Sequence, residues 1–158
     1  MRVEYINPFT ESAYNILKEV TSSDVKRGDI YLKPTSISIM GVAALVGLAG
    51  DVEGRVLFDM SKATALKVAG AMNGEEFPAI DEMVKATIQE LANMITAQAV
   101  TKLHDLGFKF DLTPPALFTG DNLEVSTNLG EVEALVVPIE LGEDGKIEVN
   151  VAIREKIR

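Results

Sequence analysis

Glu90 and Asn93 are the residues of this sequence whose types and spacing best suit chemistry on a partner. They stand three positions apart within a stretch of helical periodicity, so their side chains would be neighbours on one helix face. A carboxylate can pair with a cation, and a carboxamide can accept and donate hydrogen bonds without changing its protonation state. A pair of this kind could reach into a cleft of another protein.

The helix face around this pair is unusual because it lacks charge. Of the sixteen residues from Ala86 to Thr101, only Glu90 is charged. Helical geometry predicts that five apolar residues surround the pair and contact a partner: Met83, Ala86, Met94, Ala97 and Val100. Short side chains permit close approach, and methionine adapts to a partner's contour. The alternative is a helix buried on both sides, as a central helix or in a dimer seam, with the pair satisfied locally.

The helix that carries the pair is expected from about Ile80 to Asp105. Asp81 and Glu82 favour its start, because acidic groups stabilise a helix N-terminus, and Gly107 favours its stop. The opposite face of this helix is apolar, which predicts that it packs on a sheet; its residues are Val84, Ile88, Leu91, Ile95 and Ala99.

Two further helices are predicted. The first has Asn7 as its cap, Pro8 at its first position and Glu11 in its first turn. Its apolar stripe consists of Phe9, Ala13, Ile16, Leu17 and Val20. The second helix runs from Lys62 to Met72, with Ser61 as its cap and Asn73-Gly74 at its end.

Most of the remaining chain has the apolar patterns of strands, and its two halves resemble each other. Residues 29–41 and 109–120 each read as a strand ending in Leu-x-Pro, followed by an apolar strand ending in Gly. We therefore predict an α/β (α+β) fold, a pseudo-duplicated single domain over residues 1–158, with two long helices on a largely antiparallel sheet. The expected strands cover residues 29–32, 36–48, 55–60, 108–112, 116–119, 123–126, 132–141 and 146–153.

Composition excludes several classes of function. With 15 Lys and Arg against 24 Asp and Glu, the formal net charge is −9, which disfavours binding to nucleic acid or to an anionic membrane. The absence of cysteine excludes disulfides, cysteine zinc sites and thiol catalysis. Because the chain has a single histidine, its composition also excludes any site that needs two histidines from the same chain. The uncharged stretch from Pro34 to Gly50 reads as buried strand rather than membrane helix, so we expect a cytoplasmic protein.

The segment Ile88-Gln-Glu-Leu-Ala-Asn-Met-Ile95 resembles the Glu-x-x-Asn motif of the CheC/CheX/FliY phosphatases of bacterial chemotaxis. The downstream Leu112-Thr-Pro-Pro115, the duplicated layout and the length are similar too. The resemblance covers essentially the whole chain and is closest to CheX, which has one such motif. In the first helix, Glu11 is followed three positions on by Tyr14 and not by Asn. Ala86 departs from the family pattern, which has Asp or Ser there.

The resemblance implies a phosphatase that hydrolyses the aspartyl phosphate of a CheY-like response-regulator receiver domain. On that reading Asn93 orients the attacking water, and Glu90 pairs with the receiver's active-site lysine. It also implies that this chain holds no cofactor or metal of its own and that Mg²⁺ comes with the receiver.

Two other expectations follow. Val-rich residues 132–137 read as an exposed sheet edge, and with the resemblance they predict a homodimer through sheet edges. The alternative function is a non-catalytic module, of the receiver-binding or flagellar-switch type. An acidic scaffold unrelated to signalling is a third reading, and it predicts no phosphorylation-dependent binding.

Overall fold

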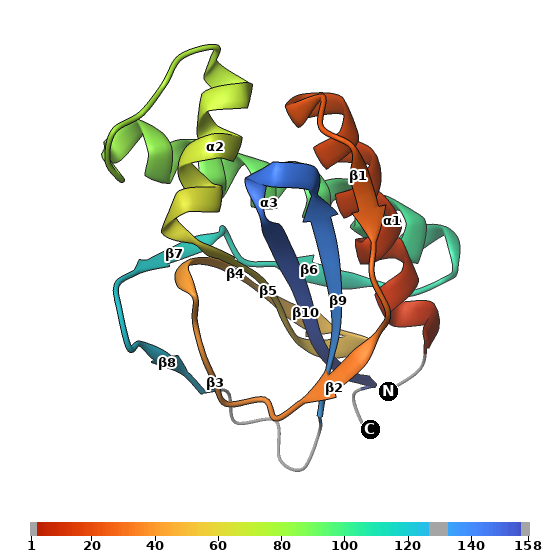
Figure 1. Cartoon of the computed structure of the whole chain (residues 1–158). Coiled ribbons are helices and arrows are strands. Elements are labelled where there is room, and N and C mark those ends of the chain that lie inside the picture. Colours follow the sequence, from red (N-terminus) through yellow and green to blue (C-terminus); the bar gives the residue numbers. More distant parts are fainter. Residues whose placement is uncertain (1–2, 127–132, 156–158) are drawn as a thin grey trace.

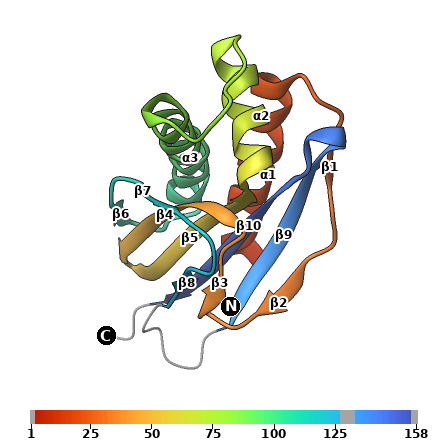
Figure 2. The same cartoon turned by 60° about the vertical axis from the view of Figure 1, so that its left-hand side comes forward.

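The computed structural model describes residues 3–126 and 133–155. Within these residues three helices, α1 (Val3–Thr21), α2 (Lys62–Asn73) and α3 (Glu82–Asp105), lie on one face of a large antiparallel sheet (Figures 1 and 2). The expected mixed fold with two long helices is confirmed, and α2 is a shorter third helix. The strands are β1 (Val25–Arg27), β2 (Tyr31–Lys33), β3 (Ile37–Ser38), β4 (Gly41–Gly50), β5 (Val52–Ser61), β6 (Phe110–Leu112), β7 (Ala116–Thr119), β8 (Glu124–Val125), β9 (Ala134–Leu141) and β10 (Lys146–Glu155), with a short 3₁₀ turn, Gly142–Asp144, between the last two.

The second and third helices begin where their capping residues predict. The Ser61 side chain accepts a hydrogen bond from the Thr64 N–H at 3.1 Å, and Asp81 accepts one from the Val84 N–H at 2.9 Å. Gly74 ends α2 at φ 70°, a left-handed conformation that glycine adopts without a steric penalty.

The first helix begins earlier than its sequence predicts. Asn7 is not its cap and Pro8 is not its first residue, because α1 begins at Val3 and contains Pro8 in its interior. Tyr5 and Ile6 are buried and extend the apolar stripe toward the N-terminus. Their burial favours helix through the residues before Pro8, although a proline inside a helix removes one N–H donor and its ring crowds the carbonyl four residues earlier.

The sheet has an internal two-fold pattern that confirms the predicted duplication. Its order is β1-β9-β10-β5-β4-β6, with β2 also on β9 and β7 also on β4. The first half, α1 to β5, thus receives β6 and β7 from the second half, and the second half receives β1 and β2 from the first. The strands β5 and β10 pair at the centre, and β3 pairs with β8.

The register of this repeat differs from the expected one. The sequence pattern matches residues 29–41 to residues 109–120, which aligns β2 with β6. The strand pairing instead aligns β1 with β6 and β2 with β7. Residues 25–33 correspond to residues 110–118 without a gap. The two Leu-x-Pro segments therefore suggest the wrong alignment. The register of the repeat follows from the strand with which each segment pairs, and not from the position of a proline.

The Val-rich segment is not an edge. Along its described residues, β9 pairs with β10 on one side and with β1 and β2 on the other. The prediction of a free edge at residues 132–137 is therefore wrong for 134–137, and residue 132 lies outside the described residues. The short strands β1 and β2 cover the edge that the sequence leaves apparently open.

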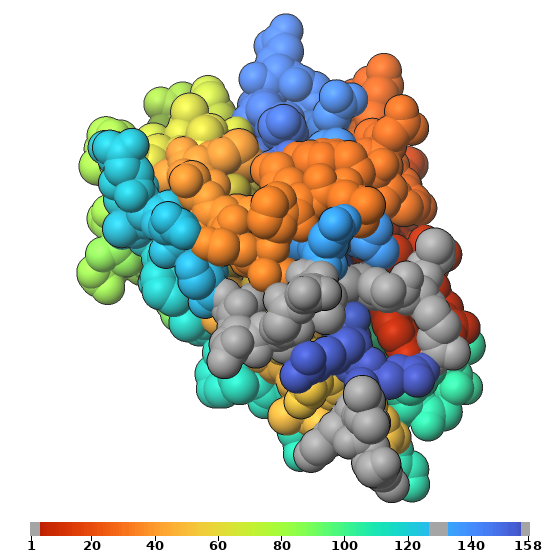
Figure 3. All heavy atoms as spheres, turned by 90° about the horizontal axis from the view of Figure 1, so that it is seen from below, coloured from red at the N-terminus to blue at the C-terminus, as the bar shows by residue number. Residues whose placement is uncertain are grey.

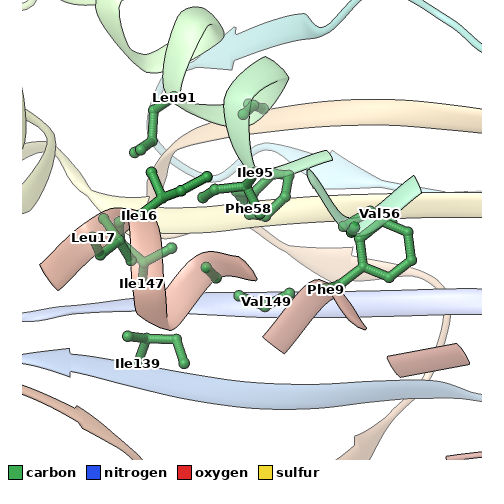
Figure 4. Close-up of a cluster of buried hydrophobic side chains, with 14 of the residues drawn as sticks. Phe9, Ile16, Leu17, Val56, Phe58, Leu91, Ile95, Ile139, Ile147 and Val149 are labelled. Atoms are coloured by element: carbon green, nitrogen blue, oxygen red, sulfur yellow. The ribbon is translucent and has the colours of Figure 1, made fainter. Parts of the chain in front are cut away.

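The main core lies between the helices and the sheet. Figure 4 shows Phe9 and Leu17 of α1 and Leu91 and Ile95 of α3 packed over Phe58 and its neighbours on the strands. A smaller cluster lies on the other face of the sheet, formed by Ile37, Ile39, Ala43 and Leu57. Segments around β2, β3 and β8 cover that face (Figure 3).

The covered face also buries charge. Asp59 and Glu148 are directly opposite each other on β5 and β10 and are 1% and 4% exposed. Burial raises the pKa of both carboxyl groups. A Met40 N–H at 2.9 Å opposes the shift at Asp59, and the Lys33 ammonium lies 3.0 Å from Glu148. Burial also lowers the pKa of Arg55 to about 10.

Candidate active site on the third helix

The long helix α3 is positioned by the side that it buries. Val84, Ile88, Leu91, Ile95 and Ala99 are each at most 2% exposed, as the apolar stripe predicts. Two threonines on the buried side satisfy their hydroxyls within the helix: Thr87 Oγ1 donates to the Met83 carbonyl at 2.7 Å, and Thr96 Oγ1 donates to the Ala92 carbonyl at 2.5 Å. This side fixes the rotation of α3, and therefore the direction of the opposite side.

Glu90 and Asn93 lie on the opposite side, where both are exposed. Within the described parts of the chain, neither side chain forms a hydrogen bond or an ion pair. The alternative of a helix buried on both sides within its own chain does not hold. The carboxylate and the carboxamide are accessible to another molecule.

Of the five apolar residues predicted around the pair, three are accessible. Met83 is 53% exposed, and Ala86 and Ala97 are exposed. Met94 and Val100 are half-buried and pack against the core. The uncharged surface beside the pair is therefore narrower than helical periodicity alone predicts.

A groove opens beside the pair. It has a volume of about 530 Å³, and its walls are α3 and the segment that follows β6. Its lining consists of Ala86, Gln89, Glu90, Asn93, Leu112, Thr113, Pro114 and Pro115. Only the family resemblance points to the Leu112-Thr-Pro-Pro115 segment, and in the structure this segment lines the same groove as the Glu-Asn pair.

The linker between β6 and β7, residues 113–115, is tied to both of its neighbours. Thr113 donates its N–H to the Gly47 carbonyl at 3.0 Å, and its Oγ1 accepts from the Gly47 N–H at 2.7 Å. Gln89 Nε2 donates to the Pro115 carbonyl at 3.1 Å. Sequence reasoning missed Gln89 and Gly47, and no local signal marks them, because their roles depend on contacts between distant segments.

The internal repeat places a second Glu-x-x-Asn sequence in α1. The same number of residues separates buried Thr10 from buried Thr96 and buried Ala13 from buried Ala99. Both threonines donate to the carbonyl four residues earlier, Thr10 at 3.1 Å. This separation aligns Glu90 and Asn93 with Glu4 and Asn7, not with Glu11 and Tyr14. Glu11 is therefore not the counterpart of Glu90, and the sequence contains two Glu-x-x-Asn segments, Glu4 to Asn7 and Glu90 to Asn93.

No group of three or more acidic or histidine side chains in the described residues could hold a metal ion. The described helices also include none that combines the length and the apolar character needed to cross a bilayer. His104, near the end of α3, packs edge-on against Phe110 with ring centres 5.3 Å apart.

The comparisons with known proteins agree with this geometry. The family model described as chemotaxis phosphatase CheX matches residues 42–140, which include α3 and the 113–115 linker. The chain is 30% identical over 156 residues to the CheY-P phosphatase CheX of Thermotoga maritima, covering 96% of this chain and 97% of that protein. This chain belongs to the CheX family.

Solved structures related to this CheX-family chain share its whole architecture. A CheX from Borrelia burgdorferi, solved in complex with CheY, BeF₃ and Mg²⁺, is 43% identical with a TM-score of 0.84, covering 98% of this chain and 100% of that one. A CheC-like superfamily protein from Shewanella sp. PV-4 is 28% identical with a TM-score of 0.86, covering 98% and 99%. The resemblance to the CheX phosphatases is confirmed, and with it the assignment of the chain as a phosphatase.

Proposed function

We propose that this chain hydrolyses the aspartyl phosphate of a CheY-like receiver domain, with Glu90 and Asn93 as the residues that enter the receiver's active site. The observation that carries the proposal is the exposure of both side chains at a groove on α3. The Thermotoga maritima relative bears the name of a CheY-P phosphatase, and the Borrelia burgdorferi relative was solved with CheY. Both relatives support the choice of partner.

Hydrolysis of an acyl phosphate does not require the phosphatase to form a covalent bond with the substrate. The aspartyl carboxylate is a good leaving group, so the main needs are a water in line with the breaking bond and stabilisation of charge on the phosphoryl oxygens. The bond between water oxygen and phosphorus forms, the bond to the aspartyl oxygen breaks, and the products are phosphate and the receiver's free carboxylate. Mg²⁺ bound to the receiver supplies charge stabilisation.

Asn93 provides the orientation of the water. Its carboxamide oxygen accepts a hydrogen bond from the water, which directs an oxygen lone pair toward phosphorus, and its amide nitrogen can donate. Because the carboxamide does not titrate near neutral pH, Asn93 positions the water rather than acting as a strong base. Its exposure on α3 makes it available for a partner's cleft.

Glu90 fixes the position of α3 on the receiver. It lies one helical turn before Asn93, and its carboxylate pairs with the active-site lysine of the receiver through a charge-assisted hydrogen bond. Such a bond places α3 so that Asn93 faces the phosphoryl group. The exposed Ala86 and Ala97 on the same helix permit close approach of the receiver.

Decay of a phosphorylated receiver tests this function. A CheY-like receiver is phosphorylated with a small-molecule donor, and its decay is followed with and without a substoichiometric amount of the chain. Multiple turnovers above the receiver's own rate are expected. Phosphorylation-dependent binding with no acceleration would instead establish the non-catalytic module and refute the enzyme.

We also propose that the chain acts in the cytoplasm as a homodimer formed through the outer strands of the sheet, β1 and β2 on one side or β6 and β7 on the other. Light scattering at micromolar concentration should give twice the mass of one chain. A strictly monomeric mass would contradict the dimer and leave the phosphatase assignment unaffected.

A further inference from the structure

The wall of the groove opposite Asn93, the 113–115 linker, has among the described residues one backbone hydrogen bond to its neighbours, from the Thr113 N–H to the Gly47 carbonyl. β6 pairs with β4 at residues 48–50 and β7 pairs with β4 at residues 42–45, so the 113–115 linker spans a gap in the ladder. Pro114 and Pro115 have no N–H and cannot close this gap themselves. The linker must be held by other groups if it is to keep one position.

Two side chains, Thr113 and Gln89, add a hydrogen bond at each end of the linker. Thr113 is bonded to Gly47 through both its N–H and its Oγ1, at 3.0 and 2.7 Å. A Cβ at Gly47 would lie 3.1 Å from Thr113 Cγ2, so the absence of a side chain at Gly47 lets Thr113 pack this closely against the strand. At the other end, Gln89 Nε2 donates to the Pro115 carbonyl at 3.1 Å and joins the linker to the helix that carries Asn93.

The first half of the molecule offers an internal comparison. Glu4 and Asn7 take the helical positions of Glu90 and Asn93, but the corresponding linker is Gly28-Asp29-Ile30, without prolines and with a charge. Gly28 bonds the Pro138 carbonyl at 2.8 Å, as Thr113 bonds Gly47, but it has no hydroxyl for a second bond. The features specific to the second half are therefore the double tie of Thr113, the two prolines and the glutamine tether.

We propose that Gln89 and Thr113 are positioning residues of the phosphatase reaction, which hold the 113–115 linker against α3 as a fixed wall beside Asn93. This inference rests on the proposed function. A free linker would have to be ordered each time the receiver docks, and a displaced wall would let the receiver's cleft settle away from the geometry that Asn93 needs.

The test compares Gln89→Leu, Thr113→Val and Thr113→Ser with the wild-type chain, and Gln98→Leu provides the matched control on the exposed surface of the same helix. Gln89→Leu and Thr113→Val should each lower kcat about 3- to 10-fold, the size expected for losing one hydrogen bond. Affinity for a receiver loaded with beryllium fluoride and Mg²⁺ should change less than about twofold, because Glu90 still docks. Thr113→Ser keeps the hydroxyl and should restore kcat, and Gln98→Leu should match the wild type.

Amide hydrogen exchange provides a readout that does not depend on activity. The Thr113 N–H should exchange about 3- to 10-fold faster in Gln89→Leu than in the wild type or in Gln98→Leu. Unchanged kcat in Gln89→Leu, or equal losses in Gln89→Leu and Gln98→Leu, would overturn the positioning role, and unchanged exchange at Thr113 would overturn the tether. If the wild-type chain fails to accelerate receiver decay, the proposed function is wrong, and exchange still decides whether Gln89 holds the linker.

Discussion

Replacement of Asn93 by alanine should separate activity from stability. Asn93 is exposed, and its side chain forms no hydrogen bond with the other described residues, so the substitution removes no internal hydrogen bond. Alanine has a higher helix propensity than asparagine by about 0.6 kcal/mol. For a domain of 158 residues, this predicts an unchanged or slightly raised Tm, by at most about 2 °C.

The same substitution should remove most of the catalysis. Loss of one group that orients a reacting water or stabilises the transition state costs about 100-fold in rate, or about 2.7 kcal/mol in the barrier. Single-turnover decay of the phosphorylated receiver at saturating phosphatase measures this loss directly. Affinity for the beryllium fluoride-loaded receiver should stay within about threefold, because Glu90 is unchanged.

Asn73→Ala is the matched control, because this asparagine on α2 has a structural role. Its Nδ2 donates to the Ala69 carbonyl and to Thr87 Oγ1, each at 2.8 Å. Its replacement should cost about 0.5–1.5 kcal/mol of stability and leave the rate unchanged. Near-normal acceleration of receiver decay by Asn93→Ala, or an equal loss of rate in both variants, would refute the water-positioning reasoning.

Three further predictions concern docking, buried charge and the core. Glu90→Ala should weaken binding of the beryllium fluoride-loaded receiver by about 10-fold in a titration and lower the decay rate with it; unchanged affinity would remove the docking role. Burial raises the pKa of Asp59 above its ordinary 3.8, so the folded state holds this proton more tightly than the unfolded chain, and the stability that it contributes is lost as the pH rises through the folded pKa. In urea titrations, the free energy of unfolding of Asp59→Asn should therefore rise relative to that of the wild type as the pH increases above about 4, and a difference that does not change with pH would contradict the raised pKa. Ile95→Ala empties a site that is 0% exposed and should cost about 2–5 kcal/mol in the same titrations; a loss under about 1 kcal/mol would show that the core closes around the cavity.

The sequence predicts the elements of this fold well where the local signal and the tertiary packing agree. Ser61 and Asp81 are capping residues with apolar periodicity behind them, and both helices begin where they indicate. The start of α1 is missed because buried Tyr5 and Ile6 outweigh the local preference that Asn7 and Pro8 express. The local sequence does not encode how far a core extends.

Pairing partners are less visible in the sequence. The valines of β9 suggest an edge, but β1 and β2, which cover it, lie about a hundred residues earlier in the chain. The same reason explains the shifted repeat, in which similar Leu-x-Pro texts in non-equivalent strands conceal the correspondence of β1 with β6. Strand partners are long-range choices that no local pattern records.

In the candidate site too, residues that share one helix could be predicted from the sequence, and residues that depend on contacts between segments could not. The Glu90 and Asn93 pair could be found from spacing and from the lack of charge around it, because both are properties of one helix. The groove needs a second segment, and Gln89 and Thr113 gain their importance only from contacts to Pro115 and Gly47. Met94 and Val100, expected on the open face, are half-buried because neighbouring elements cover part of the helix flank.

A structure of the complex with a beryllium fluoride-loaded, Mg²⁺-bound receiver tests the central claim most directly. The proposal predicts that α3 enters the receiver's active site, with the Asn93 carboxamide oxygen within hydrogen-bonding distance, about 3 Å, of a water in line with the phosphoryl mimic. It also predicts that Glu90 contacts the receiver's lysine. A receiver seated on another surface, with the Glu90 and Asn93 face open to solvent, would contradict it.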